Sequence, residues 1–299
     1  MSEKVKIVAV SGPTATGKTA LAVKLAALFD GEIVSVDSRQ VYRYMDLGTG
    51  KDLEEYGTIP YHLIDIADPA AETYNLSCFC RDAFAAIDDI RKRNKLPILC
   101  GGTALYLDAL LKGYRLPGGE LPAREKGVAR STADYEAAPS FTPPFELDPL
   151  VIGVLFDRKI VRERIEKRLD ARFESGMVDE VRKLHDIQGV SYEKLEFFGL
   201  EYREIAQYLQ EKCSFEEMRQ SLLDKIRQFA KRQDIFFRKI ERSGQDIYWC
   251  REGKDPDPAD LVKQFLAGDQ LPEITFRLAD VDYGKKKVTV SYSGHCQEP

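Results

Sequence analysis

Hydrophobic residues along the chain form short runs that alternate with helical segments. The runs cover Val5 to Val10, Ile33 to Val36, His62 to Ile66, Pro97 to Cys100 and Val151 to Phe156. The helical segments between them cover Lys18 to Phe29, Ser38 to Tyr44, Ser77 to Asn94 and Ala104 to Lys112. Strands that alternate with helices predict a parallel sheet in a three-layer α/β fold. In such a fold, ligands bind at the carboxyl ends of the strands.

The second half of the chain has a different pattern. It begins after a stretch from Pro117 to Pro149 that contains six prolines and shows weak periodicity, which is typical of a long loop. From Arg158 to about Ile240 the pattern is helical, with breaks at Gly176, at Gly189 and around Phe198-Gly199. The tail from Ile274 to Tyr292 alternates polar and apolar residues, which predicts a β-hairpin. We therefore expect a helical half appended to the sheet.

One motif points to a ligand. Residues Gly12 to Thr19 read GPTATGKT and lie between the first strand and the first helix. In the pattern G-x-x-x-x-G-K-T, backbone N–H groups converge on a phosphate at the positive end of a helix. Lys18 can reach terminal oxygens, and Thr19 can hold a magnesium ion. The sequence thus predicts a doubly wound parallel sheet of the P-loop NTPase type that binds a diphosphate or polyphosphate.

Composition narrows the remaining chemistry. With 299 residues and 43% apolar content, the chain can bury a real core. It contains neither the roughly 20 consecutive apolar residues that cross a bilayer nor the pattern of a secretory signal. The six cysteines lack paired C-x-x-C spacing, and the three histidines lie far apart, which argues against a zinc site, a disulfide framework or a histidine triad. We expect a cytoplasmic protein without a membrane partner, in which a carboxylate handles proton transfer.

Charge is unevenly distributed. The formal net charge is −5, but the segment from Lys225 to Arg242 has seven basic residues against two acidic ones, with aromatic residues at Phe229, Phe236 and Phe237. Such a helix can bind nucleic acid, since binding depends on local potential. It can equally be an ordinary amphipathic helix with a solvated charged face. Composition alone leaves both interpretations open.

Two strand ends are candidates for the site. Asp37 follows the second strand, so its carboxylate is expected to face the phosphate loop, where it can accept a proton or hold magnesium through water; it can also cap the next helix. The fourth strand ends in Gly101-Gly102-Thr103, which allows a substrate to approach the backbone, or merely a tight turn. An ATPase usually has a magnesium-binding Asp there. Asp65, at the end of another predicted strand, is a possible substitute.

Together these segments resemble the tRNA dimethylallyltransferases, also called tRNA isopentenyltransferases. The resemblance covers most of residues 5 to 242. It rests on seven segments in order: GPTATGKT (Gly12 to Thr19), DSRQVYRYMDLGTGK (Asp37 to Lys51), YHLIDI (Tyr61 to Ile66), LPILCGGTALYLDALLKG (Leu96 to Gly113), RERIEKRLDARFESGMVDEV (Arg162 to Val181), GLEYREIAQYL (Gly199 to Leu209) and QFAKRQDIFFRKI (Gln228 to Ile240).

The resemblance implies transfer of a dimethylallyl group from dimethylallyl diphosphate to N6 of an adenosine beside the anticodon of tRNA. Asp37 would be the general base. Lys18, Thr19 with Mg²⁺, and Arg168 would stabilise the departing diphosphate. Arg168 could equally be an ordinary charged residue on the solvated face of a helix, with no role in the site. The diphosphate itself would lie on Gly12, Pro13, Thr14, Ala15, Thr16, Gly17, Lys18 and Thr19.

The same resemblance assigns residues to the acceptor. Ser38, Gln40 and Thr103 would hold the flipped-out adenine together with Asp37, and Arg39 belongs to the same segment. Lys231, Arg232 and Gln233 would lie against tRNA. The partners implied are therefore dimethylallyl diphosphate and the anticodon arm of a tRNA, and we expect the enzyme to act as a monomer.

The chain departs from the family in one place. Family members carry a helical insertion that grips the anticodon arm, whereas here only the Pro-rich stretch occupies that position. We therefore divide the chain into a first core part (1–116), the Pro-rich loop (117–149), the last core strand with the helical RNA-binding half (150–270) and a hairpin-like extension (271–299). The shortened segment favours one alternative, prenyl transfer to a free adenine nucleotide. A small-molecule P-loop kinase shares the loop and the sheet and is a second alternative, although the missing magnesium-binding Asp argues against it.

Overall fold

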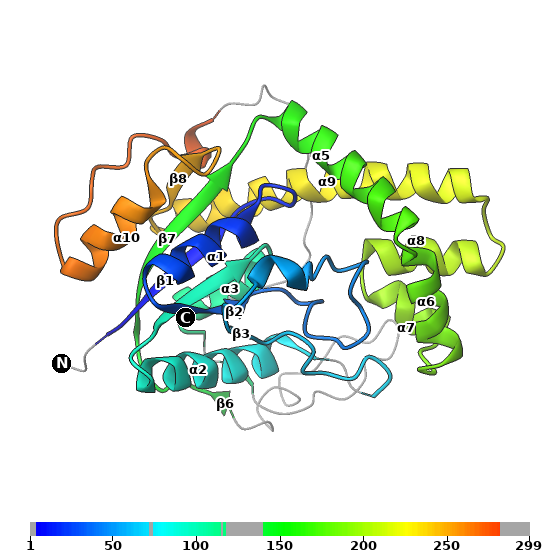
Figure 1. Cartoon of the computed structure of the whole chain (residues 1–299), viewed down its shortest axis with the longest axis horizontal. Helices are drawn as coiled ribbons and strands as arrows, with labels where there is room; N and C mark the ends of the chain where they lie inside the picture. Colours follow the sequence, from blue (N-terminus) through cyan, green and yellow to red (C-terminus); the bar gives the residue numbers. More distant parts are fainter. Residues whose placement is uncertain (1–3, 72–73, 115, 118–139, 282–299) are drawn as a thin grey trace, which may run out of the picture.

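The computed structural model describes residues 4–71, 74–114, 116–117 and 140–281 (Figure 1). The first part of the chain contains β1 (Val5–Ser11), α1 (Lys18–Leu28), β2 (Gly31–Ser35), the 3₁₀ helix η1 (Leu53–Tyr56), β3 (Tyr61–His62), α2 (Leu76–Lys92), β4 (Leu96–Gly101), α3 (Ala104–Leu111) and β5 (Leu116–Pro117). The second part contains β6 (Ser140–Phe141), β7 (Leu147–Leu155), α5 (Arg158–Glu174), α6 (Met177–Asp186), α7 (Tyr192–Phe197), α8 (Leu200–Leu209), α9 (Phe215–Arg242), β8 (Tyr248–Arg251), α10 (Pro258–Ala267) and the 3₁₀ helix η2 (Leu278–Asp280).

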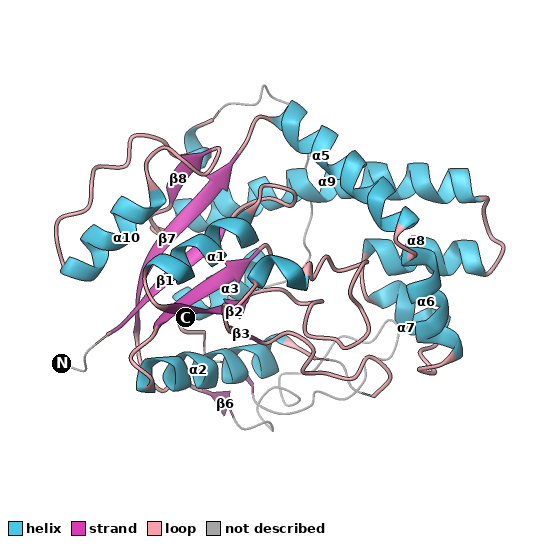
Figure 2. Cartoon of the chain, in the orientation of Figure 1, coloured by secondary structure: helices cyan, strands magenta, loops and turns pink. Residues whose placement is uncertain are grey.

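Six strands form one parallel sheet in the order β3-β2-β4-β1-β7-β8. The central strands are buried over almost their whole length, which explains their continuous apolar runs, because a parallel sheet is covered on both faces. Helices α1 and α10 pack on one face, and α2, α3 and the second half of α9 pack on the other (Figure 2). The predicted fold class, a P-loop NTPase-like doubly wound sheet with a helical half, is confirmed.

A second hydrophobic core lies outside the sheet. Helices α5 to α8 gather at one end of the molecule, and their apolar faces pack with the first half of α9 and with residues 41–47 (Figure 1). Helix α9 has 28 residues, so it is about 42 Å long. Its residue Leu222 belongs to this second core, whereas its residue Phe237 belongs to the sheet core. One continuous helix therefore joins the two halves of the chain.

Some predicted elements are wrong. The segment from Ser38 to Tyr44 forms turns instead of a helix, and the strand expected from His62 to Ile66 is reduced to Tyr61–His62. In both places the chain bends toward Lys51, which contacts Tyr42 and Asp65, and it does not continue as a regular helix or strand. Sequence analysis also missed β8 and α10, which extend the sheet beyond β7 and cover its face.

The outer segments differ in part from the predicted division of the chain. Strand β7 starts at Leu147, so the boundary drawn at residue 150 cuts through a strand, and β8 rather than β7 is the last strand of the sheet. Residues 271–281 form an irregular segment ending in η2, not the predicted hairpin strand. Most of the Pro-rich loop, residues 118–139, and the remainder of the predicted hairpin, residues 282–299, lie outside the described residues.

The loop that follows β2 is organised by a buried lysine. Lys51 is only 1% exposed, and its ammonium donates to the carbonyl of Tyr42 at 2.6 Å and to Asp46 at 2.8 Å, and it pairs with Asp65. From α6, the carboxylate of Glu180 accepts the backbone N–H groups of residues 46–48 at 2.7 to 3.1 Å. These contacts fix the bent chain between Tyr42 and Asp65.

We predict that Lys51→Met destabilises the protein. The substitution leaves the Tyr42 carbonyl without its partner and removes two ion pairs, so the free energy of unfolding should fall by about 2 kcal/mol. Urea denaturation measures this change. The matched control is Lys92→Met, which removes an exposed pair with Asp88 on the surface of α2 and should leave the unfolding midpoint nearly unchanged. Equal stability of the two variants would contradict the role given to Lys51.

Candidate active site

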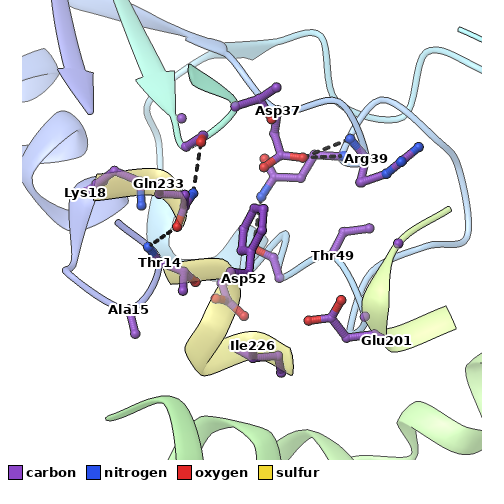
Figure 3. A pocket seen from close by; sticks show the side chains of 18 of the residues that line it. Thr14, Ala15, Lys18, Asp37, Arg39, Thr49, Asp52, Glu201, Ile226 and Gln233 are labelled. Atoms are coloured by element: carbon purple, nitrogen blue, oxygen red, sulfur yellow. Dashed lines mark hydrogen bonds between the residues drawn. The ribbon is translucent and has the colours of Figure 1, made fainter. Parts of the chain in front are cut away.

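A cavity of about 890 Å³ opens at the carboxyl ends of β1, β2 and β4 (Figure 3). Its walls come from the phosphate loop, the segment after Asp37, the end of β4, and helices α5, α8 and α9. The cavity therefore lies between the sheet and the helical half, as expected for ligands of a doubly wound sheet.

The phosphate loop has the geometry that its sequence predicts. The backbone turns at Ala15 and Gly17, which have φ angles of 62° and 78°. A Cβ at Gly12 would lie 2.6 Å from the carbonyl oxygen of Val154, so the loop can run this close to β7 only because position 12 is glycine. Within the described residues, no hydrogen bond occupies the N–H groups of residues 15–19. They form a cradle for an anion at the start of α1.

Lys18 reaches back over this cradle. Its ammonium donates to the carbonyl of Pro13 at 2.8 Å, and burial lowers the pKa of Lys18 to about 8, with nearby Arg168 acting in the same direction. Burial also raises the pKa of the neighbouring Cys100 thiol to about 11. A buried ammonium without a bound counter-ion is unfavourable, so an anion in the cradle would stabilise the charge on Lys18.

Two helices of the helical half hold Thr14. From α5, Arg168 donates through Nη2 to the Thr14 hydroxyl at 2.6 Å. From α9, the side-chain carbonyl of Gln233 accepts the Thr14 N–H at 2.9 Å (Figure 3). Burial, followed by the charge of Arg172, lowers the pKa of Arg168 to about 10. Arg168 is thus a partly buried residue of the cavity and not the solvated helix charge that the alternative interpretation assumed.

Asp37 lines the same cavity, between the cradle and the loop that follows β2. Its Oδ1 accepts the N–H groups of Arg39 at 2.8 Å and Gln40 at 3.4 Å, so the carboxylate caps a turn and not the predicted helix. No hydrogen bond to Oδ2 is formed within the described residues. Burial raises the pKa of Asp37, while the two N–H groups, Arg39 and Lys18 oppose this shift. A carboxylate in this setting is a stronger base than one in water.

The residues predicted to hold the adenine are near Asp37, but two of them already have internal partners. The Thr103 hydroxyl accepts the Ser38 N–H at 3.1 Å, and the Gln40 side chain bridges Ser35 and Gly50 at 2.9 and 3.0 Å. Arg39 is stacked over Phe197, with 5.5 Å between its guanidinium carbon and the ring centre.

The cavity brings together most of the residues predicted from the sequence. It is lined by Thr14, Ala15, Gly17, Lys18, Thr19, Asp37, Ser38, Arg39, Gln40, Thr103, Arg168, Arg232 and Gln233, whereas Gly12, Pro13, Thr16 and Lys231 do not line it. The three residues predicted to lie against tRNA therefore have different environments. Lys231 is exposed outside the cavity, Arg232 is exposed at its wall, and Gln233 is buried.

Comparison with known proteins agrees with this geometry. A family model described as IPP transferase matches residues 40–139 and 123–240, and one described as isopentenyl transferase matches residues 5–57. The tRNA dimethylallyltransferase 1 of Geotalea uraniireducens (strain Rf4) is 43% identical over 300 residues, covering 89% of this chain and 98% of that protein. The chain belongs to the IPP transferase family.

Solved structures show the same fold. A tRNA isopentenylpyrophosphate transferase from Bacillus halodurans is 31% identical, with a TM-score of 0.71 over 89% of this chain and 96% of that one. A eukaryotic dimethylallyltransferase acting on tRNA is 21% identical and has a TM-score of 0.73 over 90% of this chain and 81% of that one. The IPP transferase model matches in two segments that overlap at residues 123–139. The overlap lies inside the Pro-rich stretch, where we expect the insertion to be shortened.

The sequence patterns did not point to several further residues of the cavity. Arg164, Lys167 and Arg172 line the cavity from the same face of α5 as Arg168, and Glu201 enters it from α8. The Nη2 atom of Arg172 is buried without a hydrogen bond to any described residue, although it lies 3.6 Å from Asp52. The spacing of these basic residues, three or four positions apart, was a signal that they share one helix face.

Two side chains of the cavity carry oxygen donors of the kind that bind Mg²⁺. The described residues contain no group of three or more His, Cys, Asp or Glu side chains placed to bind a metal. The Thr19 hydroxyl and the Asp37 carboxylate are oxygen donors in the cavity, and Mg²⁺ commonly takes one or two protein oxygens together with phosphate oxygens and water. Asp65 does not replace the missing Asp of an ATPase, because it pairs with Lys51 and does not line the cavity.

Among the helices that the structure describes, none is both long enough and apolar enough to cross a membrane.

We predict that the affinity for inorganic diphosphate falls as the pH rises past about 8. Lys18 attracts the anion only in its protonated form, and in the free protein that form is lost near pH 8. Calorimetric titration between pH 6 and 10 measures the dependence. Lys18→Arg keeps its charge over this range, so the variant should lack the fall even if it binds more weakly. The same pH dependence in both proteins would contradict the prediction.

Proposed function

We propose that this chain transfers a dimethylallyl group from dimethylallyl diphosphate to N6 of an adenosine next to the anticodon of a tRNA, releasing diphosphate. The observation that carries the proposal is one cavity that holds both a free anion cradle and a partly buried carboxylate, in a chain that is 43% identical to a tRNA dimethylallyltransferase. The cradle serves the leaving group, and the carboxylate serves the attacking nitrogen.

The reaction requires one bond to form and one to break. The N6 nitrogen attacks the allylic carbon, the bond from that carbon to the diphosphate oxygen breaks, and N6 loses a proton. Asp37 accepts this proton through its unoccupied Oδ2, which burial makes more basic. The proton then passes to solvent, and the carboxylate is restored.

Charge develops on the diphosphate as it leaves. The cradle residues Ala15 and Gly17, the Lys18 side chain and the Arg168 side chain line this region, so their N–H groups and positive charges would stabilise the anion. Thr19 would hold Mg²⁺ on the diphosphate oxygens, where the ion adds positive charge.

The acceptor must place an exocyclic amine next to Asp37. Ser38, Gln40 and Thr103 border that position. The bond from Ser38 to Thr103 and the bonds from Gln40 to Ser35 and Gly50 fix the wall against which an adenine would lie. Such an approach needs the base to leave its stack, which single-stranded anticodon loops allow. A free adenine nucleotide could enter the same cavity, but the matched relatives named above are tRNA enzymes, which favours tRNA. A monomer in the cytoplasm remains our prediction.

A transfer assay tests the function directly. Purified protein is incubated with labelled dimethylallyl diphosphate and either unmodified tRNA or AMP, and we expect label in tRNA. Asp37→Ala should abolish transfer but leave binding of the diphosphate substrate nearly intact, because the cradle does not include Asp37. Label found only in AMP would overturn the choice of acceptor. Unchanged turnover in the variant would overturn the assignment of the base.

The exposed basic part of α9 gives a separate prediction for tRNA binding. Affinity for tRNA should fall as the salt concentration rises. The variant Lys231→Ala/Arg232→Ala should bind more weakly and with a shallower salt dependence, because fewer counter-ions leave the tRNA when fewer cations bind its phosphates. Filter binding between about 50 and 200 mM salt measures both slopes. Identical slopes would mean that this helix face is merely solvated.

A further inference from the structure

Gln233 differs from its neighbours on α9. Lys231 and Arg232 are exposed, as expected for a helix that meets RNA, but Gln233 is only 6% exposed and points into the cavity beside the phosphate loop (Figure 3). Both ends of its amide are used. The carbonyl accepts the Thr14 N–H at 2.9 Å, and the Nε2 group donates to the carbonyl of Gly102 at 2.9 Å.

The first of these bonds removes a donor from the anion cradle. Residues 15–19 keep their N–H groups free within the described part of the chain, whereas the N–H of Thr14 is occupied by a side chain from α9. The Thr14 hydroxyl is occupied as well, by Arg168. The loop therefore offers an anion only its inner donors, which lie closest to the start of α1.

The second bond places the amide beside Lys18. A Cβ at Gly102 would lie 2.8 Å from the Nε2 atom of Gln233 and 3.7 Å from Cε of Lys18, so the three groups are crowded together. In phosphate loops of this pattern, the backbone cradles the inner phosphates and the lysine reaches toward the terminal ones. The Gln233 amide stands at this outer side, where a third phosphate would have to enter.

We propose that Gln233 restricts the loop to diphosphates by filling the position of a third phosphate and holding the Thr14 N–H away from it. Gln233 is a positioning residue, since it acts through Thr14 and Gly102. The inference deepens the proposed function, on which it rests, because it explains how a loop of the NTPase pattern could select a prenyl diphosphate where nucleoside triphosphates are also available. It also gives a physical reason for glycine at position 102, which lets the amide approach the backbone.

Binding of inorganic diphosphate and inorganic triphosphate, each with Mg²⁺, tests the inference by calorimetry. The unaltered protein should bind diphosphate about tenfold or more tightly than triphosphate, the factor expected from one hydrogen bond to a charged group. In Gln233→Ala the Thr14 N–H and the adjacent space become available, so this preference should shrink about tenfold. An unaltered protein without the preference, or a Gln233→Ala variant that keeps it in full, would overturn the inference.

Two further variants separate selection from loss of structure. Gln228→Ala makes the same chemical change at an exposed position of α9 and should leave the ratio of the two affinities unchanged. Gln233→Glu fills the same space but brings a negative charge, so both anions should bind more weakly while the preference for diphosphate persists. If Gln233→Ala does not fold, a lost preference in Gln233→Glu would itself contradict the space-filling role.

These measurements do not depend on prenyl transfer. A protein that discriminates between the two anions through Gln233 but modifies no tRNA would refute the proposed function and keep this inference. A protein that prenylates tRNA but binds both anions equally would refute only the inference.

Discussion

Thr14 is the residue through which the helical half holds the phosphate loop. Its backbone N–H is bound by Gln233 of α9, and its hydroxyl is bound by Arg168 of α5, so a single residue of the phosphate loop is fixed by two helices of the other half. A hydrogen bond contributes most to specificity where its partners are buried, because an unpaired group there is costly. The shape of the anion cradle thus depends on the helical half as well as on the strand, loop and helix that form it.

Helix α9 makes this dependence possible. Its first half packs in the helical core and its second half packs on the sheet, with Gln233 between the two parts. A continuous helix transmits the position of one core to the other, since its hydrogen-bonded backbone resists bending. The adjacent Arg232 lies at the wall of the cavity, so the helix that we expect to meet tRNA is the same one that holds the phosphate loop.

Burial prepares the cavity for both parts of the proposed reaction. It lowers the pKa of Lys18 and Arg168 and raises the pKa of Asp37, because the charged form of each group is disfavoured away from water. A bound diphosphate would stabilise the charge on the two cations. The same surroundings leave Asp37 more ready to take a proton. The pKa shifts of the cations and of the base therefore have one physical cause, burial between the sheet and the helical half.

The local parts of the site could be predicted from the order of the residues alone. The strand, loop and helix around GPTATGKT are formed by contiguous residues, so their spacing was enough to predict the cradle, and the position of Asp37 after a strand was enough to direct it to the same edge. The segment from Ser38 to Tyr44 was wrongly predicted as a helix because its turns are held by side chains, Asp37 at Arg39 and Gln40 and Lys51 at Tyr42, which periodicity cannot register. That Gln233 is buried in the cavity while its neighbours Lys231 and Arg232 are exposed could be seen only in the folded chain. Neighbours on a helix point in different directions, and the packing of two separate cores determines which of them faces the cavity.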